Sequence, residues 1–238
     1  MTPLILGVDS GLDGAFVWLR GGVVLHHVLT RTLVKSGVID MDLLGDHSAT
    51  VTVGAGSMYL PRIACLEQPF NAAISGGAST SGYTDQCKRW GRLQGWLESW
   101  GYEVKGVQAK TWQREILDLG RFEVRTEKAC APRLAEGHRL TRRKTGFAFV
   151  DPTYVTNFNP KFYPTRASCL EYVATSHPDA ILTTKQVLSH DTKAASIAYA
   201  REHFPGVTLV PLRSRNPHDG LADAVCIAVW GSTQVKET

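Results

Sequence analysis

The chain has 238 residues, 43% of them hydrophobic, and its 26 Lys and Arg against 22 Asp and Glu give a net charge of +4. This length and composition exclude a disordered chain and predict one large domain, or a core domain with an insertion. No run approaches the roughly 18 apolar residues that a membrane-spanning helix needs, so we expect no membrane partner.

The N-terminal part of the chain predicts three short strands. Two apolar runs flank the Gly-rich turn Ser10–Gly14, and a third run follows closely, which is typical of an antiparallel meander. The three runs are residues 4–9, 15–19 and 23–28. Residues 30–60 have no clear period and predict a loop with a short helix at about 40–44.

A buried strand is predicted at 63–67, because its residues are apolar on both faces. The Gly- and Ser-rich segment 71–83 indicates a mobile loop. From 85 to 100, tryptophans and leucines recur at helical spacing up to Gly101, which predicts a helix with its tryptophans in the core or a subunit interface. A strand at 104–107 and a helix at 111–119 complete this part.

Residues 121–189 interrupt the alternation of strands and helices and are interpreted as an insertion. The segment from Arg121 to Arg166 contains ten Lys and Arg but only four Asp and Glu, so its net charge is +6 and that of the rest of the chain is −2. Such a segment favours a polyanionic partner, nucleic acid first, with a solvated basic face as the alternative. A helix at 191–203, a strand at 207–211 and an apolar helix at 221–231 follow, which makes an α/β fold.

The five cysteines are widely spaced and contain no C-x-x-C pair, which favours a reducing, intracellular compartment over a disulfide framework. Two of them share a C-x7-H spacing: Cys130 with His138, and Cys169 with His177. Zinc sites usually space the first pair of ligands by two to four residues, so unpaired side chains are the expected interpretation and a metal site the alternative.

Four carboxylates stand where a metal site would need them. Asp9 and Glu67 end two predicted strands, and Asp219 and Asp223 are four residues apart and share a helix face. Clustered carboxylates repel one another unless divalent cations neutralise them, and oxygen ligands favour Mg²⁺ or Mn²⁺ over zinc. Taken singly, each acid could be a solvated strand end or helix cap. His218, just before the pair, could orient water or a phosphate, or cap the helix.

Three motifs in this order resemble the RuvC family of Holliday junction resolvases, which have the RNase H-like fold. They are Gly7–Gly11 with Gly14-Ala15, Leu66–Phe70, and His218–Ala224 followed by an apolar helix. The last motif and Phe204-Pro205 most resemble the monokaryotic chloroplast branch. The resemblance covers about 1–28, 63–120 and 190–232. It implies a single nuclease domain over 1–238, with a mixed five-stranded sheet flanked by helices and a basic insertion at about 121–189.

The resemblance also implies a set of active-site residues. Asp9, Glu67, Asp219 and Asp223 match the metal-binding acids of the family, which hold two Mg²⁺ or Mn²⁺ ions per active site, and Lys193 matches a catalytic lysine that faces the scissile phosphate. Asp223 stands where the chloroplast branch usually has Glu, so a water-mediated metal contact is an alternative there. The pair Asp219 and Asp223 is four apart, as in that branch, and not three as in bacterial members.

By the same resemblance, Phe70 stacks on bases opened at the crossover, with packing under the loop as the alternative. Gln68, Tyr83 and Lys110 are further expected DNA contacts, and Lys110 and Lys193 could instead be merely solvated. The insertion has no recognised counterpart, but its basic residues, followed by two phenylalanines, could grip a DNA arm by neutralising phosphates. These are Arg139, Arg142, Arg143 and Lys144.

The sequence therefore predicts a homodimeric, Mg²⁺-dependent endonuclease that resolves four-way DNA junctions by symmetric paired nicks. Its expected location is an organelle, after removal of a targeting peptide, or the cytoplasm or nucleoid of a prokaryotic or viral system. The alternatives are an inactive junction-binding protein and an RNase H-type enzyme that cuts RNA–DNA hybrids. Gly7–Gly11 also resembles the phosphate loop of acetate-kinase and Hsp70-type ATPases, but those proteins need two such domains.

Overall fold

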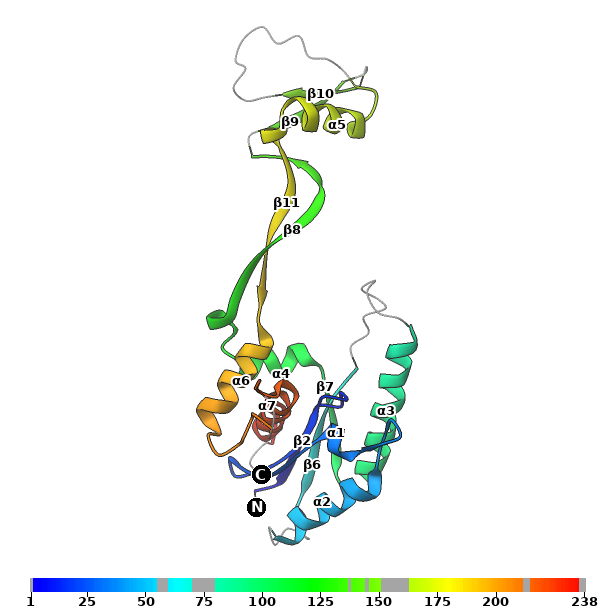
Figure 1. Ribbon diagram of the computed structural model, residues 1–238, viewed down its shortest axis with the longest axis vertical. Coiled ribbons are helices and arrows are strands. Elements are labelled where there is room, and N and C mark those ends of the chain that lie inside the picture. The colour runs from blue at the N-terminus through cyan, green and yellow to red at the C-terminus, as the bar shows by residue number, and fades with distance from the viewer. Residues whose placement is uncertain are drawn as a thin grey trace. The chain divides into compact units, whose positions relative to one another are not determined.

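The computed structural model describes residues 2–54, 60–69, 80–136, 138–143, 146–150, 163–211 and 215–235. The chain divides into two compact units, Met1–Phe122 with His190–Thr238, and Glu123–Ser189 (Figure 1). The second unit begins two residues after the start of the predicted insertion and ends at the same residue. Within the described ranges, no helix is both long and apolar enough to cross a membrane.

A five-stranded mixed sheet forms the centre of the first unit, in the order β3-β2-β1-β6-β7. The first three strands form the predicted antiparallel meander, and the last two run parallel to β1. The strands are β1 (Leu4–Val8), β2 (Ala15–Arg20), β3 (Val23–Leu29), β6 (Arg62–Glu67) and β7 (Glu103–Val107). The prediction of an α/β fold with a mixed five-stranded sheet is confirmed. Because Val8 pairs with Leu66, the carboxyl ends of β1 and β6 lie side by side.

Helices cover both faces of this sheet (Figure 1). One face carries α4 (Ala109–Ile116), α6 (Thr192–His203) and α7 (Asp219–Thr233), and the other carries α2 (Met41–Gly54) and α3 (Thr80–Ser99). Successive side chains of a strand point to opposite faces. Ile5 therefore packs under α7, whereas Leu4 and Leu6 pack under α2 and α3.

Helix α7 lies directly on β1 because glycines allow a close approach. A Cβ atom on Gly7 would lie 2.2 Å from the carbonyl oxygen of Ala224, and one on Gly231 would lie 2.9 Å from Cγ2 of Ile5. The start of α7 is thus near the end of β1, and its end is near the beginning of that strand, at Ile5. This antiparallel arrangement brings the N-terminus of α7 to the edge of the sheet where β1 and β6 end.

Residues 30–60 contain more structure than the predicted loop. Besides α1 (Thr30–Leu33) and a hairpin of β4 (Val34–Lys35) and β5 (Val38–Ile39), they form the fourteen-residue helix α2. The hydropathy pattern misses most of α2 because its buried face includes Ser48 and Thr52 beside Leu44 and Val51. Buried hydroxyl groups do not count as apolar positions, so the helical period is incomplete in the sequence.

Other boundaries also differ from the predictions. The strand predicted at 207–211 is wrong: this segment has no strand, its Leu209 packs in the core, and the carbonyl oxygen of Leu209 accepts a hydrogen bond from His218 N. Helix α3 begins at Thr80, so the end of the predicted loop is helical, while residues 70–79 lie outside the described part of the chain. Helix α4 ends at Ile116, and a separate 3-10 helix, η1 (Leu119–Phe122), includes the predicted end of the helix.

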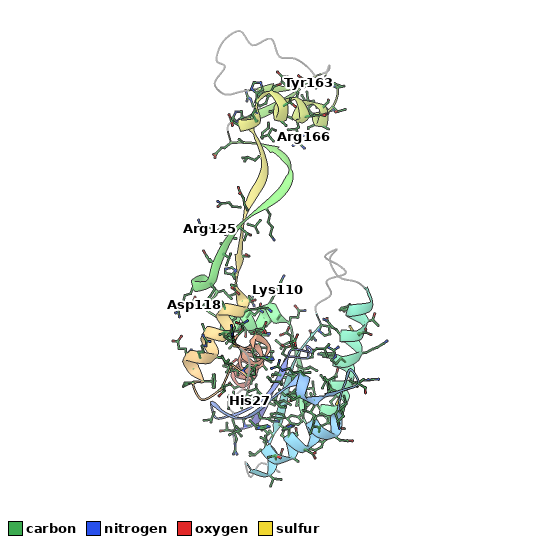
Figure 2. The ribbon with its side chains drawn as sticks, in the orientation of Figure 1. His27, Lys110, Asp118, Arg125, Tyr163 and Arg166 are labelled. Carbon is green, nitrogen blue, oxygen red and sulfur yellow. The ribbon has the colours of Figure 1, made fainter. Side chains whose placement is uncertain are left out.

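The second unit has a ribbon and a small core of its own. In the ribbon, β8 (Glu123–Leu134) pairs with β11 (Ile181–His190), and side chains such as Arg125 project from it (Figure 2). An antiparallel hairpin of β9 (Arg139–Arg143) and β10 (Gly146–Val150) packs against α5 (Arg166–Ser176), which the short helix η2 (Pro178–Ala180) follows. The core of this unit consists of Phe149, Cys169, Val173 and Ala180.

Candidate active site

Two of the predicted carboxylates lie at the adjacent ends of β1 and β6. Asp9 Oδ1 accepts a hydrogen bond from the backbone N–H of Gly11 at 2.9 Å, and Glu67 Oε2 accepts one from the indole N–H of Trp112 at 3.1 Å. Burial raises the pKa of both carboxyl groups, and the charge of a neighbouring carboxylate raises it further. The pKa of Glu67 reaches about 7.

Helix α7 adds the other two carboxylates, Asp219 at its first position and Asp223 one turn later. A Cβ atom on Gly220 would lie 2.9 Å from Asp9 Oδ2, so the first turn of α7 lies against the Asp9 side chain. Burial raises the pKa of Asp223 to about 7, with the hydroxyl of Ser196 opposing the shift and the charges of Asp9 and Asp219 adding to it. The four predicted acids are therefore near enough for their charges to shift one another's pKa values.

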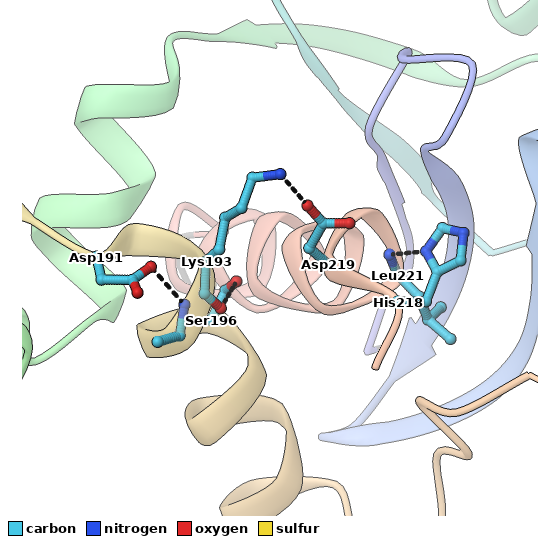
Figure 3. A network of polar contacts seen from close by, with 7 residues as sticks. Asp191, Lys193, Ser196, His218, Asp219 and Leu221 are labelled. Atoms are coloured by element: carbon cyan, nitrogen blue, oxygen red, sulfur yellow. Dashed lines mark hydrogen bonds and ion pairs between the residues drawn. The ribbon is translucent and has the colours of Figure 1, made fainter. Parts of the chain in front are cut away.

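Lys193, in the first turn of α6, forms an ion pair with Asp219 across the gap between α6 and α7 (Figure 3). The hydrogen bond within this pair lowers the pKa of Asp219 and raises that of Lys193. The Lys193 side chain remains 73% exposed. Asp219 is therefore neutralised by a cation of the chain itself, whereas Asp9, Glu67 and Asp223 remain short of positive charge.

His218 is the N-cap of α7 (Figure 3). Its Nδ1 accepts a hydrogen bond from the backbone N–H of Leu221 at 3.0 Å, and its ring is buried. Burial lowers the pKa of the imidazole, and the nearby charge of Arg31 lowers it further. Of the two roles considered for His218, the structure shows the helix cap, and a role towards water or phosphate stays a prediction.

The chemistry of this donor set fits an oxygen-ligated divalent cation. Buried carboxylates with raised pKa values are groups that lack a counter-charge, and Mg²⁺ or Mn²⁺ would supply it. In the described residues, however, no three His, Cys, Asp or Glu side chains are grouped so that they could hold a metal ion. One of the four carboxylates, Asp219, is paired with Lys193 instead.

Four further residues at this site escape the sequence-based predictions. Trp112 donates a hydrogen bond to Glu67, the Ser196 hydroxyl lowers the pKa of Asp223, and the charge of Asp13 raises the pKa of Asp9. Arg89 Nη1 donates a hydrogen bond of 3.4 Å to the carbonyl oxygen of Ser10. The Trp112 and Arg89 contacts span 45 and 79 residues, so no local pattern reveals them, whereas Asp13 lies visibly in the Gly-rich turn after Asp9.

The predicted DNA contacts of the first unit come from three elements. The Gln68 side chain lies over β7, because a Cβ atom on Gly106 would be 2.5 Å from its Nε2. Tyr83 is half-buried on α3, and Lys110 is exposed on α4 (Figure 2). Phe70 lies outside the described residues. None of these placements tests a contact with DNA.

The basic residues of the second unit that are predicted to contact DNA phosphates lie on β9 or directly after it. Arg139 and Arg142 are exposed, and the Arg142 guanidinium lies over the Phe147 ring at 5.9 Å from its centroid. The Arg143 side chain and all of Lys144 lie outside the described residues. The exposed arginines are consistent with either a phosphate contact or a solvated face.

The C-x7-H residues pack around one aromatic ring in the second unit. His138 and His177 both contact Phe149, with ring centroids 5.6 and 5.1 Å apart, and Cys169 is buried in the same core. The Cys130 side chain is outside the described part. Among the described side chains, Cys169 belongs to this core and the two histidines are half-buried against Phe149, and they form no metal-binding group.

No protein-family model matches this chain, and no curated protein matches it. The resemblance to the RuvC family therefore rests on the three motifs at Gly7–Gly11, Leu66–Phe70 and His218–Ala224. The described parts of these motifs meet at one edge of the sheet, at the ends of β1 and β6 and the start of α7.

Proposed function

We propose that this chain is a RuvC-like endonuclease with an RNase H-like fold, which resolves four-way DNA junctions by Mg²⁺- or Mn²⁺-dependent hydrolysis. The observation that carries the proposal is the group of Asp9, Glu67 and Asp223, three half-buried carboxyl groups with raised pKa values at the ends of β1 and β6 and the start of α7. Such a group is unfavourable in a chain that has only a structural use for it. A divalent cation removes the repulsion and gives the acids a function.

Asp9, Glu67 and Asp223 would hold the cations, and Asp219 would join them when Lys193 releases it. Two such ions, when bound, activate water and stabilise the leaving oxygen in phosphodiester hydrolysis. The residues of the chain position the substrate. Lys193 is exposed beside the carboxylates and would bind a phosphate oxygen, and the positive end of the α7 dipole would favour the same anion.

The alternatives fit the structure less well. The ATPase folds that resemble Gly7–Gly11 consist of two similar domains, whereas the second unit of this chain is a β-ribbon with a small hairpin and helix. A junction-binding protein without activity has no use for three half-buried acids with raised pKa values. An RNase H-type hybrid nuclease would use the same carboxylates, so it differs from our proposal only in its substrate.

Cleavage of labelled four-way junctions, beside duplex, flap and RNA–DNA hybrid controls, tests this proposal when the product ends are mapped. With Mg²⁺ we expect paired nicks in the junction and no comparable cleavage of the controls. Asp9→Asn should lower cleavage by about 10³-fold or more, because one charged ligand is lost, and should keep or strengthen junction binding. The matched control is Asp46→Asn, an exposed position on α2. Cleavage retained in Asp9→Asn would contradict the proposal.

Paired nicks need two active sites, and each chain supplies one group of carboxylates. We therefore propose that the working form is a homodimer with twice the 26.1 kDa of the chain. Sedimentation at micromolar concentration should give this mass. A monomer with full resolution activity would rule the homodimer out and leave the hydrolytic chemistry in place.

A further inference from the structure

A groove of about 240 Å³ lies in the first unit between α3 and the β4–β5 hairpin. The hairpin side is mostly apolar, and the helix side is charged. Its lining residues are Gly37, Val38, Ile39 and Met41 on one side, and Asp85, Lys88, Arg89 and Arg92 on the other. None of these described lining residues is one that the sequence predicts to bind DNA.

The groove has a net positive charge. Three basic side chains line it against a single acid, Asp85. Asp85 forms only a weak surface pair with Lys88, at 4.0 Å and with both side chains about 70% exposed. The basic residues share one side of the helix, since Lys88 and Arg92 are four residues apart and Arg89 and Arg92 are three apart.

The groove begins next to the carboxylate group. Arg89 reaches from α3 to the carbonyl oxygen of Ser10, the residue that directly follows Asp9. The Ser10 hydroxyl in turn donates a hydrogen bond of 3.5 Å to the carbonyl oxygen of Glu67. A chain of contacts therefore connects the basic side of α3 with both strand ends that carry the acids.

A polymer with regularly spaced negative charges matches this surface better than a single anion does. Successive phosphates of a strand can meet successive basic side chains along α3, while the sugars contact the apolar hairpin. The exposed Val38 side chain, 48% accessible, lies on that hairpin side. We propose that this groove binds the phosphate backbone of the DNA strand as it leaves the carboxylate group, an inference that rests on the nuclease function proposed above.

Fluorescence anisotropy of a labelled four-way junction in EDTA tests the groove over a series of salt concentrations. Arg92→Gln, and Lys88→Gln combined with Arg92→Gln, remove charge at exposed helix positions that tolerate glutamine. We expect affinity to fall about 3- to 10-fold per charge and the slope of log K against log salt to become shallower by about one per lost phosphate contact. Asp85→Asn should act in the opposite direction and tighten binding by about twofold.

The matched control is Arg201→Gln, which removes the same charge from α6 on the opposite face of the sheet. Its affinity and salt slope should stay within error of the wild type. If the wild type binds the junction and the double variant behaves like this control, the proposal that the groove binds DNA is wrong and the nuclease proposal stands. If the wild type neither binds nor cleaves the junction, both are overturned. Melting temperatures equal to the wild type show that the variants are folded.

Discussion

Glu67 and Asp223 make large contributions to the way the stability of the metal-free chain depends on pH. Burial raises the pKa of each carboxyl group to about 7, well above its value in an unfolded chain. The folded state therefore binds protons more tightly than the unfolded state between these values. The contribution of each group is fully present below pH about 4, and it is lost as the pH rises through about 7. Asp219 acts in the opposite direction below pH about 4, because Lys193 lowers its pKa. Burial lowers the pKa of His26, His27 and His218, which opposes the trend up to pH about 6.5.

The melting temperature of the chain in EDTA should therefore fall between pH 5 and pH 8. Asp223→Asn removes one raised carboxyl group and should increase the free energy of unfolding at pH 8 by about 2 to 4 kcal/mol, since one pKa unit corresponds to about 1.4 kcal/mol. Thermal denaturation followed by circular dichroism at several pH values measures both effects. A variant curve parallel to that of the wild type would show that Asp223 is not the cause.

Lys193 competes with a metal ion for Asp219, because both are cations directed at the same carboxylate. Lys193→Gln should therefore strengthen Mn²⁺ binding by about tenfold, equivalent to about 1.4 kcal/mol, while junction cleavage falls because a phosphate contact is lost. Binding is measured by the rise in melting temperature with Mn²⁺ concentration. The control is Arg201→Gln, an exposed position on α6. Weaker Mn²⁺ binding in Lys193→Gln would mean that the lysine supports the metal instead of competing with it.

At the scale of elements, the contact between β1 and α7 holds the site together. A Cβ atom on Gly7 would lie 2.2 Å from Ala224 O and 2.5 Å from Ala228 N, and both atoms belong to the helix backbone. Gly7→Ala should therefore cost about 3 kcal/mol or more in urea denaturation, because the helix has to move. Gly91→Ala on α3 is the control: it has open space and should stabilise by up to about 1 kcal/mol. Equal stability of the two variants would contradict this packing.

Elements that carry their own pattern could be predicted from the sequence. The apolar runs before Asp9 and Glu67 form β1 and β6, and the apolar segment after Asp219 forms α7. The segment 207–211 has the composition of a strand but no neighbouring strand with which to pair, so its composition misleads. Helix α2 hides its period behind buried hydroxyl groups. In both cases the outcome depends on tertiary packing, which a local window does not contain.

For the candidate active site too, local patterns could be predicted from the sequence and contacts between elements could not. The four acids could be predicted because each stands at the end or start of a recognisable element. Trp112, Ser196 and Arg89 could not, since each acts on a residue of another element. The ion pair between Lys193 and Asp219 also needs two helices to be placed before it can be inferred.

At the scale of the whole molecule, charge divides between the two units. Ten of the 26 basic and six of the 22 acidic residues belong to 123–189, so this unit carries the entire net charge of +4. The first unit has sixteen basic and sixteen acidic residues, so its net charge is zero, and it contains the candidate active-site acids. If both units bind DNA, the first does so through local features such as the α3 groove, and the second through its overall charge.

Removal of 123–189 separates these two contributions. The backbone N–H of Asp191 donates to the carbonyl oxygen of Phe122 at 2.9 Å, so the chain enters and leaves the second unit at one point, and a short Gly-Ser link from Phe122 to His190 can replace it. We expect a cooperative melting transition within about 5 °C of the full chain, because the core of the first unit is complete without the insertion.

Junction affinity of this shortened chain should fall about 10-fold or more at 0.1 M salt, with a shallower salt slope, because the net charge drops from +4 to zero. Asp9→Asn should lower Mg²⁺-dependent cleavage by the same factor in the full and in the shortened chain. Unchanged affinity would assign DNA binding to the first unit alone. Loss of the melting transition would show instead that the second unit is needed for folding, which the separate hydrophobic clusters of the two units argue against.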